Sequence, residues 1–224
     1  MLTLRPGLGV FQEYYETGPL SNLSPSTISW IPSLTTFMMF LGGPFVGHLF
    51  DSYGPRPLLL VGSIFHVFGL MMTSLSTKYY QYILAQGICS PLGASMIFYP
   101  AMSSVPTWFL KKRAFAFGIM AAGSSLGGVI FPIMVQRLIP EVGFGWTIRI
   151  VAFMILALLI VANLTVTSRI NHTPKPFILM NFVKPLTEPT FALVTAGSFL
   201  FFYGLFLPFT YIILQAQELS LIHI

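Results

Sequence analysis

The sequence has few charged residues and almost no cysteine. Only 8% of its 224 residues are charged, whereas 55% are apolar, and soluble domains usually carry about 25% charged residues. A soluble domain of this size could not cover its surface with so few charges, so a soluble enzyme, a disordered tail and a nucleic-acid-binding protein are excluded. The single cysteine, Cys89, excludes an internal disulfide and a zinc site built from thiolates.

Long uncharged stretches are what the sequence has instead. Six of them hold 19 or more consecutive residues without Asp, Glu, Lys or Arg, and a membrane helix needs about 20 mostly apolar residues. They predict an all-α membrane protein, because open strands in hydrocarbon would leave backbone groups unpaired. The six transmembrane helices are expected at 27–50, 57–76, 80–105, 114–136, 148–167 and 190–214.

Basic residues are distributed unevenly between the two sides of the predicted membrane. Seven of the 11 follow the first, third and fifth spans, at Arg56, Lys111, Lys112, Arg113, Arg169, Lys175 and Lys184. Loops rich in Lys and Arg stay in the cytoplasm, so these seven are expected inside and both chain ends outside. An external amino terminus without a signal peptide predicts a helix missing upstream, and therefore a fragment.

The turn between the first two spans carries the most specific motif, which reads Gly47-His48-Leu49-Phe50-Asp51-Ser52-Tyr53-Gly54-Pro55-Arg56. Glycines allow a tight turn and close helix approach, and a carboxylate near a helix start is favoured by the helix dipole. The alternative is a solvated turn with incidental charges. The motif resembles the pattern G-x-L-x-D-x-x-G-x-R/K of the major facilitator superfamily. Gly47, Asp51, Gly54 and Arg56 fit it, and the resemblance implies that Asp51 braces the outward-open state against the second half of the transporter.

A second motif runs from Trp108 to Gly123 and reads WFLKKRAFAFGIMAAG. It resembles the fifth-helix signature of the monocarboxylate transporter family. Lys111, Lys112 and Arg113 are expected to hold one helix end at the lipid headgroups, and Gly118 and Gly123 to offer small surfaces for helix contact. The alternative is a basic anchor followed by ordinary packing glycines.

The resemblance covers nearly the whole chain and implies a domain organisation. The six spans correspond to the second to seventh helices of a major facilitator fold, in the style of the fungal branch. The expected parts are a remnant of the first helix with its outer loop at 1–26, a five-helix block of the N-terminal half at 27–167, a central cytoplasmic linker at 168–189, the first helix of the C-terminal half at 190–214, and a candidate non-native tail at 215–224.

The function implied by this resemblance is secondary active transport of small organic solutes by alternating access. Monocarboxylates carried with a proton are the family's substrates, and the implied location is a multi-pass protein of the plasma membrane. The family's fourth, fifth and seventh helices line the substrate cavity, which makes Ser95, Tyr99, Ser124 and Ser125 lining candidates. Interhelical hydrogen bonding is the alternative for the serines. A non-transporting membrane sensor, or a truncated regulatory protein on the same fold, is the alternative for the whole chain.

No enzymatic site is predicted. No catalytic constellation and no ATP-binding G-x-x-x-x-G-K-[ST] pattern occurs in the sequence, and neither a metal nor a cofactor is expected. Two ionisable residues in or beside the spans have two interpretations each. His66 is either a functional group or a neutral imidazole bonded to a neighbouring helix. Arg149 either anchors a span edge at the interface or attracts anions from a distance.

Overall fold

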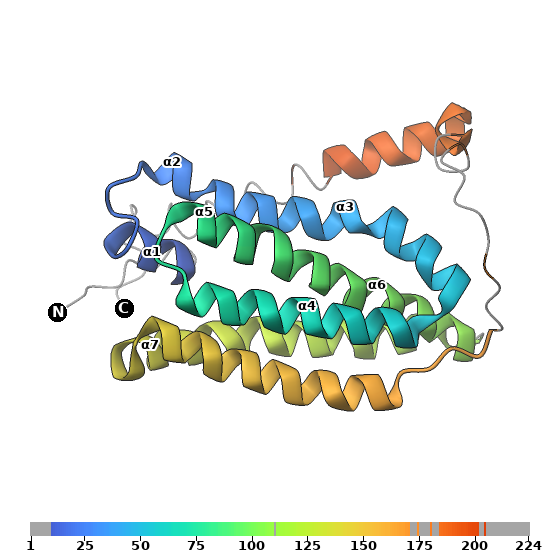
Figure 1. The fold of residues 1–224 in the computed structure, drawn as a ribbon. Coiled ribbons are helices and arrows are strands. Elements are labelled where there is room, and N and C mark those ends of the chain that lie inside the picture. The colour runs from blue at the N-terminus through green and yellow to red at the C-terminus, as the bar shows by residue number, and fades with distance from the viewer. Residues whose placement is uncertain are drawn as a thin grey trace, which may run out of the picture. The chain divides into compact units, whose positions relative to one another are not determined.

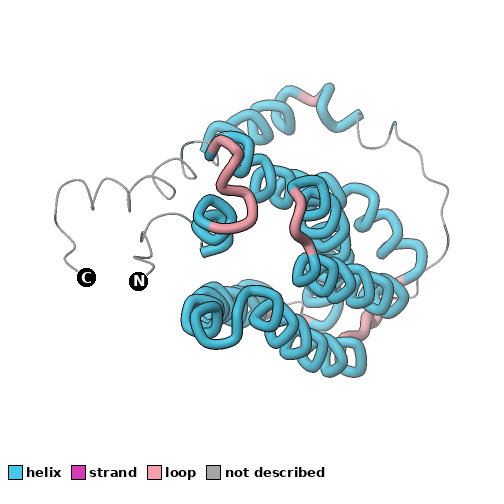
Figure 2. Tube along the Cα trace, turned by 60° about the vertical axis from the view of Figure 1, so that its left-hand side comes forward, coloured by secondary structure: helices cyan, strands magenta, loops and turns pink. Residues whose placement is uncertain are grey.

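The computed structural model describes residues 10–109, 111–170, 174, 180, 184–201 and 204. The chain divides into two compact units, Tyr14–Lys175 and a second unit of Met1–Glu13 with Pro176–Ile224. The described residues form helices joined by short loops and contain no strand (Figure 2). The predicted all-α class is therefore confirmed. In chain order the labelled helices are α1 (Val10–Thr17), α2 (Pro25–Ile28), α3 (Trp30–Tyr53), α4 (Pro55–Leu75), α5 (Tyr79–Tyr82), η1 (Ile83–Cys89), α6 (Ser90–Trp108), α7 (Arg113–Thr165) and η2 (Lys184–Thr187), and a further helix, Pro189–Phe201, follows.

Four helical segments are long and apolar enough to cross a membrane, namely Pro25–Tyr53, Pro55–Leu75, Tyr79–Trp108 and Arg113–Thr165. The first three confirm the predicted spans at 27–50, 57–76 and 80–105 within a few residues. Within the Tyr14–Lys175 unit, α3, α4, α6 and α7 run alongside one another (Figure 1). The sixth predicted span begins with an apolar helix, Pro189–Phe201. Most of 202–214 lies outside the described residues, so the full length of that span stays a prediction.

The fourth segment, α7, holds two spans. Gly143 has φ 78° and ψ 164° inside it, a conformation that a side chain would strain. The α7 ribbon doubles back along its length (Figure 1), and the predicted spans at 114–136 and 148–167 lie on either side of Gly143. Phe144 packs against the end of α1, where the Tyr14 ring stacks on it at 4.0 Å. Tyr15 is buried in the same cluster and donates a hydrogen bond to Gln86.

The third span is helical throughout but changes its winding. Ser90 donates its backbone N–H to Ala85, five residues back, so that Ile83–Cys89 forms a π-helix. Pro91 explains the change, because it has no N–H to give the Gly87 carbonyl and its ring crowds that carbonyl in a regular α-helix. A wider turn relieves the crowding, and such turns recur at functional sites.

Contact between α4 and α6 is close because both helices present glycines. A Cβ added at Gly93 would lie 2.3 Å from the His66 backbone nitrogen and 2.7 Å from the Gly62 carbonyl oxygen. A Cβ added at Gly69 would lie 2.7 Å from the Ser90 nitrogen. These distances leave no room for any side chain, so the two backbones touch directly, as small residues permit between membrane helices.

The predicted orientation can be tested by cysteine labelling. Lys78 is expected outside and Lys112 inside, since the basic loops should be cytoplasmic, and both side chains are exposed. In a Cys89→Ser background, Lys78→Cys should react with an impermeant maleimide in intact cells. Lys112→Cys should react only after permeabilisation. The reverse labelling pattern would contradict the orientation.

Candidate transport site

Most hydroxyl groups inside the spans bond to the backbone of their own helix. The side chains of Ser63, Thr73, Ser104, Ser125 and Thr147 each donate to the carbonyl four residues earlier, at 2.6 to 3.1 Å. This bond satisfies the hydroxyl where no water is available and costs the helix little. A hydroxyl that makes this hydrogen bond needs no further partner from a bound solute.

Three hydroxyls differ from this pattern. They lie on α6 and on the part of α7 that precedes Gly143, which we call its first arm; the part after Gly143 is the second arm. Tyr99, Ser103 and Ser124 make no side-chain hydrogen bond among the residues that the structure describes, and all three keep exposed surface. An unsatisfied hydroxyl in hydrocarbon costs roughly 2–7 kcal/mol, depending on the reference state. These groups therefore indicate surfaces that meet water or a polar solute. Tyr99 and Ser103 lie four residues apart and share one face of α6.

The four predicted lining residues separate into two groups. Ser95 has no exposed surface, and its hydroxyl donates to the Leu92 carbonyl at 2.8 Å. It packs on Gly42 of α3, where an added Cβ would lie 2.4 Å from the Ser95 Oγ. Ser125 bonds to Ala121. Both hydroxyls therefore bond within their own helices, and neither makes the interhelical hydrogen bond that was the alternative interpretation. Ser95 packs between helices, whereas Ser125 is exposed.

Tyr99 and Ser124 retain the features of lining residues. The Tyr99 ring lies against α3, where a Cβ added at Gly43 would be 2.9 Å from the phenol oxygen. It also packs against the buried cluster of Val46, Phe50 and Leu58. Because Gly43 has no side chain, the Tyr99 ring can lie directly against α3 at this position. Ser124 is exposed on α7, and in the described part of the chain no hydrogen bond joins it to α6.

The loop motif forms a sharp turn between α3 and α4. Gly54 is buried and has φ 78°, and its N–H donates to the Phe50 carbonyl at 2.8 Å. Pro55 then begins α4 with its φ already set for a helix. Asp51 and Arg56 are exposed on the two sides of this turn. The expected tight turn is present at Gly54, whereas a Cβ at Gly47 would meet no described atom within 4 Å.

The fifth-helix motif begins α7 with its cations exposed. Lys111, Lys112 and Arg113 all face solvent, and the Arg113 Nε donates to the Phe109 carbonyl at 3.3 Å. This placement fits an interfacial anchor. Helix contact by Gly118 and Gly123 is not seen, because an added Cβ at either would meet nothing within 4 Å among the described residues.

Two polar contacts between helices settle the interpretation of His66 and add a pair that sequence reasoning missed. The His66 Nδ1 lies 3.1 Å from the Ser90 carbonyl oxygen and 3.0 Å from its hydroxyl, so the imidazole is a helix-to-helix contact. Asn163 of α7 donates to the Ser63 hydroxyl of α4 at 2.9 Å. The pair could have been found from the sequence, because Asn163 places a side-chain amide inside the apolar span at 148–167.

Arg149 lies at the start of the second arm of α7. Its Nε donates to the Ser74 hydroxyl at 3.2 Å, and its guanidinium carbon lies 4.9 Å from the centre of the Trp146 ring. Both contacts hold the cation beside α4, which fits anchoring. Over the described ranges, no group of three or more His, Cys, Asp or Glu side chains could hold a metal.

Comparison with known proteins identifies the family. The model of the Major Facilitator Superfamily matches residues 7–222, so the chain belongs to this superfamily. It is 55% identical over 96% of its length to an MFS-type transporter of Gibberella moniliformis and 57% identical over 96% to MFS-type transporter 1 of an Ophiocordyceps species. It is 52% identical over 94% to the Fujikurins efflux protein of Gibberella fujikuroi.

The matches cover part of each relative. The aligned region is 52%, 48% and 45% of these three proteins, so the chain spans about half the length of the curated relatives it matches. Fungal relatives of this kind, together with the apolar helices, make the chain an integral multi-pass membrane protein of a transporter superfamily. The comparisons support the superfamily and its fungal members, and not the monocarboxylate family in particular.

Proposed function

We propose that this chain forms the N-terminal half of a secondary transporter that exports small organic solutes by alternating access. The observation that carries the proposal is the set of three hydroxyls without a hydrogen bond among the described residues, Tyr99, Ser103 and Ser124, on helices whose other hydroxyls are bonded to the protein. In such transporters the binding site lies near the bilayer midplane between two repeats. Export is favoured over uptake because one relative at 52% identity is named an efflux protein.

The chemistry of this half favours an uncharged solute. The charged residues of α3 to α7 all lie near the ends of the proposed spans, as Asp51, Arg56, Arg137 and Arg149 illustrate. A carboxylate bound at the midplane would need a cation close by, because an unpaired charge there is costly. Tyr99 and the serines offer hydrogen bonds and an aromatic face instead. A carboxylate carried with a proton remains the alternative that the family resemblance implies, with its cation supplied by another segment.

Metabolite export tests the proposed function. Deleting the gene in its own cells should raise the ratio of intracellular to extracellular concentration of at least one uncharged organic metabolite, and the restored gene should reverse this. A Tyr99→Phe gene should restore it only partly, because the phenol oxygen is lost while the ring still fills the space beside Gly43. Plasma-membrane location is part of the proposal, since export into the medium requires it.

Two results would contradict the proposal. If only carboxylates such as lactate change their ratio, the alternative substrate class is correct. If no solute ratio changes but cells lose a response to an external solute, the chain acts as a sensor. Matched amounts of wild-type and Tyr99→Phe protein in membranes, measured by immunoblotting, exclude loss of the protein as the cause.

A further inference from the structure

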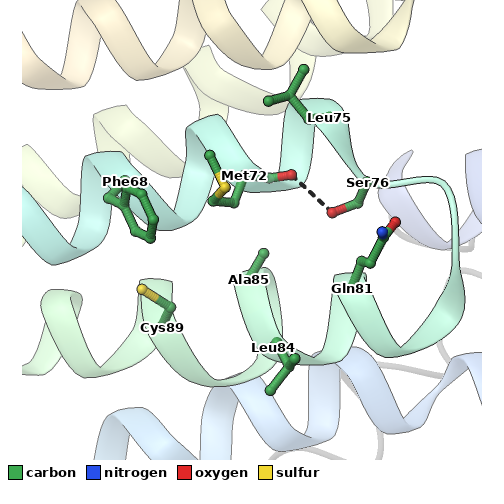
Figure 3. A pocket seen from close by; sticks show the side chains of 8 residues that line it. All are labelled: Phe68, Met72, Leu75, Ser76, Gln81, Leu84, Ala85 and Cys89. Atoms are coloured by element: carbon green, nitrogen blue, oxygen red, sulfur yellow. Dashed lines mark hydrogen bonds between the residues drawn. The ribbon is translucent and has the colours of Figure 1, made fainter.

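An apolar groove lies between α4 and the segment formed by α5 and η1, separate from the hydroxyls of the proposed transport site. Its volume is about 350 Å³, and its lining consists of Phe68, Met72, Leu75, Ser76, Gln81, Leu84, Ala85 and Cys89. Figure 3 shows Phe68, Met72 and Leu75 on α4 and Ser76 directly after it, with the other four side chains on the facing segment. All belong to the Tyr14–Lys175 unit.

The groove exists because a small side chain lies between large ones. Ala85 is 6% exposed and forms the floor, whereas Phe68, Leu75 and Leu84 are each more than half exposed and form the walls. The wider winding of η1 coincides with this floor. Cys89 lies at the end opposite Ser76 and Gln81 (Figure 3), and its thiol donates to the Phe65 carbonyl at 3.5 Å. The body of the groove is therefore apolar.

The other end of the groove is polar. The Ser76 hydroxyl donates to the Met72 carbonyl at 2.8 Å (Figure 3), and the Gln81 side-chain oxygen accepts the backbone N–H groups of Thr77 and Lys78 at 2.8 and 3.0 Å. These bonds use the Gln81 oxygen and leave its NH₂ group available as a donor among the described residues. Lys78 is exposed at the same turn and adds a positive charge.

The length and position of the groove match one leaflet of a bilayer. Phe68 of α4 and Ser76, the residue that follows this helix, are eight residues apart, which corresponds to about 12 Å at 1.5 Å per residue. The hydrocarbon of one leaflet is roughly 15 Å deep, half of the bilayer core. The polar end coincides with the turn between two spans, where Tyr80 is exposed as an interfacial aromatic residue.

We propose that this groove binds a phospholipid with an anionic headgroup, its acyl chain lying between α4 and η1 and its phosphate beside Lys78 and Gln81. An acyl chain fits the apolar body, and a phosphate of a lipid in the leaflet on the Lys78 side fits a cation next to an amide donor. The apolar face of a second helix would give no partner to the Lys78 charge or to the Gln81 NH₂ group, which makes a lipid the better match. This lipid would exchange with the bulk bilayer more slowly than the lipids around the rest of the protein.

Photo-crosslinking tests the proposal. The purified chain is reconstituted in phosphatidylcholine vesicles that contain a trace of phosphatidylglycerol with a diazirine near the end of its acyl chain. Crosslinked peptides are then mapped by mass spectrometry. Insertion into the groove residues should exceed insertion into the exposed Leu158 and Leu164 of α7 at least threefold. Phosphatidylcholine carrying the same diazirine should give a clearly smaller excess.

Two variants and a competition experiment make the test specific. Lys78→Gln should remove the preference for phosphatidylglycerol, and Ala85→Leu should lower groove insertion several-fold by filling the floor. Ala157→Leu, at an exposed position of α7, is the matched control and should change nothing. Unlabelled phosphatidylglycerol should compete in the wild-type chain, which keeps the test valid if Ala85→Leu misfolds. Equal insertion at the groove and at Leu158 would overturn the proposal.

Discussion

Gly93→Ala is expected to destabilise the chain strongly, although it adds only one methyl group. The new Cβ would lie 2.3 Å from the His66 backbone nitrogen and 2.7 Å from the Gly62 carbonyl oxygen. Backbone atoms cannot move aside as a flexible side chain can, so α4 and α6 must separate. Overpacking typically costs 1–3 kcal/mol, and we expect about 3 kcal/mol here. The melting temperature of the purified chain in detergent should fall by roughly 6 °C or more.

Gly128→Ala is the matched control for this variant. It makes the same change inside a predicted span, but its Cβ would meet no described atom within 4 Å. Its melting temperature should stay within about 2 °C of the wild type, since surface substitutions usually change stability by no more than about 0.5 kcal/mol. Equal melting temperatures for Gly93→Ala and the wild type would show that α4 and α6 do not touch through their glycines.

Asp51→Asn is expected to slow transport without reducing the amount of protein in the membrane. Asp51 is exposed on the last turn of α3, three residues before the Gly54 turn, so removing its charge should not affect insertion. Its family-implied role is to bias the two access states through the second half of the transporter. Losing about 1.4 kcal/mol of such a bias changes the equilibrium tenfold. Turnover should therefore fall about tenfold in a transporter that carries this half.

Glu141→Gln provides the control for Asp51→Asn. Glu141 is an exposed carboxylate near the turn inside α7, and its neutralisation should leave turnover unchanged. Transport is measured as initial rates of solute export at matched membrane expression. Wild-type rates in Asp51→Asn would remove Asp51 from the residues that control the access states.

The positions of the helices could be predicted from the sequence because charges are so rare in it. The gaps between charges located the first three spans within a few residues of the observed helices. They also separated the two arms of α7, which the backbone joins through Gly143. The turn at Gly54 was predictable because the motif places a glycine where φ is positive. These features depend on local sequence alone.

The contacts between helices could not be predicted in the same way. Ser95, Tyr99 and Ser103 share a face by their spacing, yet Ser95 is buried against Gly42 while the other two keep exposed surface. The rotation of α6 against α3 decides this difference, and four-residue spacing does not fix the rotation. The glycines of α4 and α6 were missed for the same reason, because Gly62 and Gly93 are close only after the helices pack.

Water accessibility of the unsatisfied hydroxyls tests the central claim most directly. In a Cys89→Ser background, Ser103→Cys and Ser124→Cys are treated with a charged methanethiosulfonate reagent in membrane sheets that expose both sides. Ser104→Cys and Leu158→Cys are the controls, since Ser104 is buried and bonded to the Pro100 carbonyl and Leu158 is exposed on an apolar arm of α7. We predict modification of the first pair at least tenfold faster than of the controls. Equal, slow modification of all four positions would contradict a solute pathway along these helices.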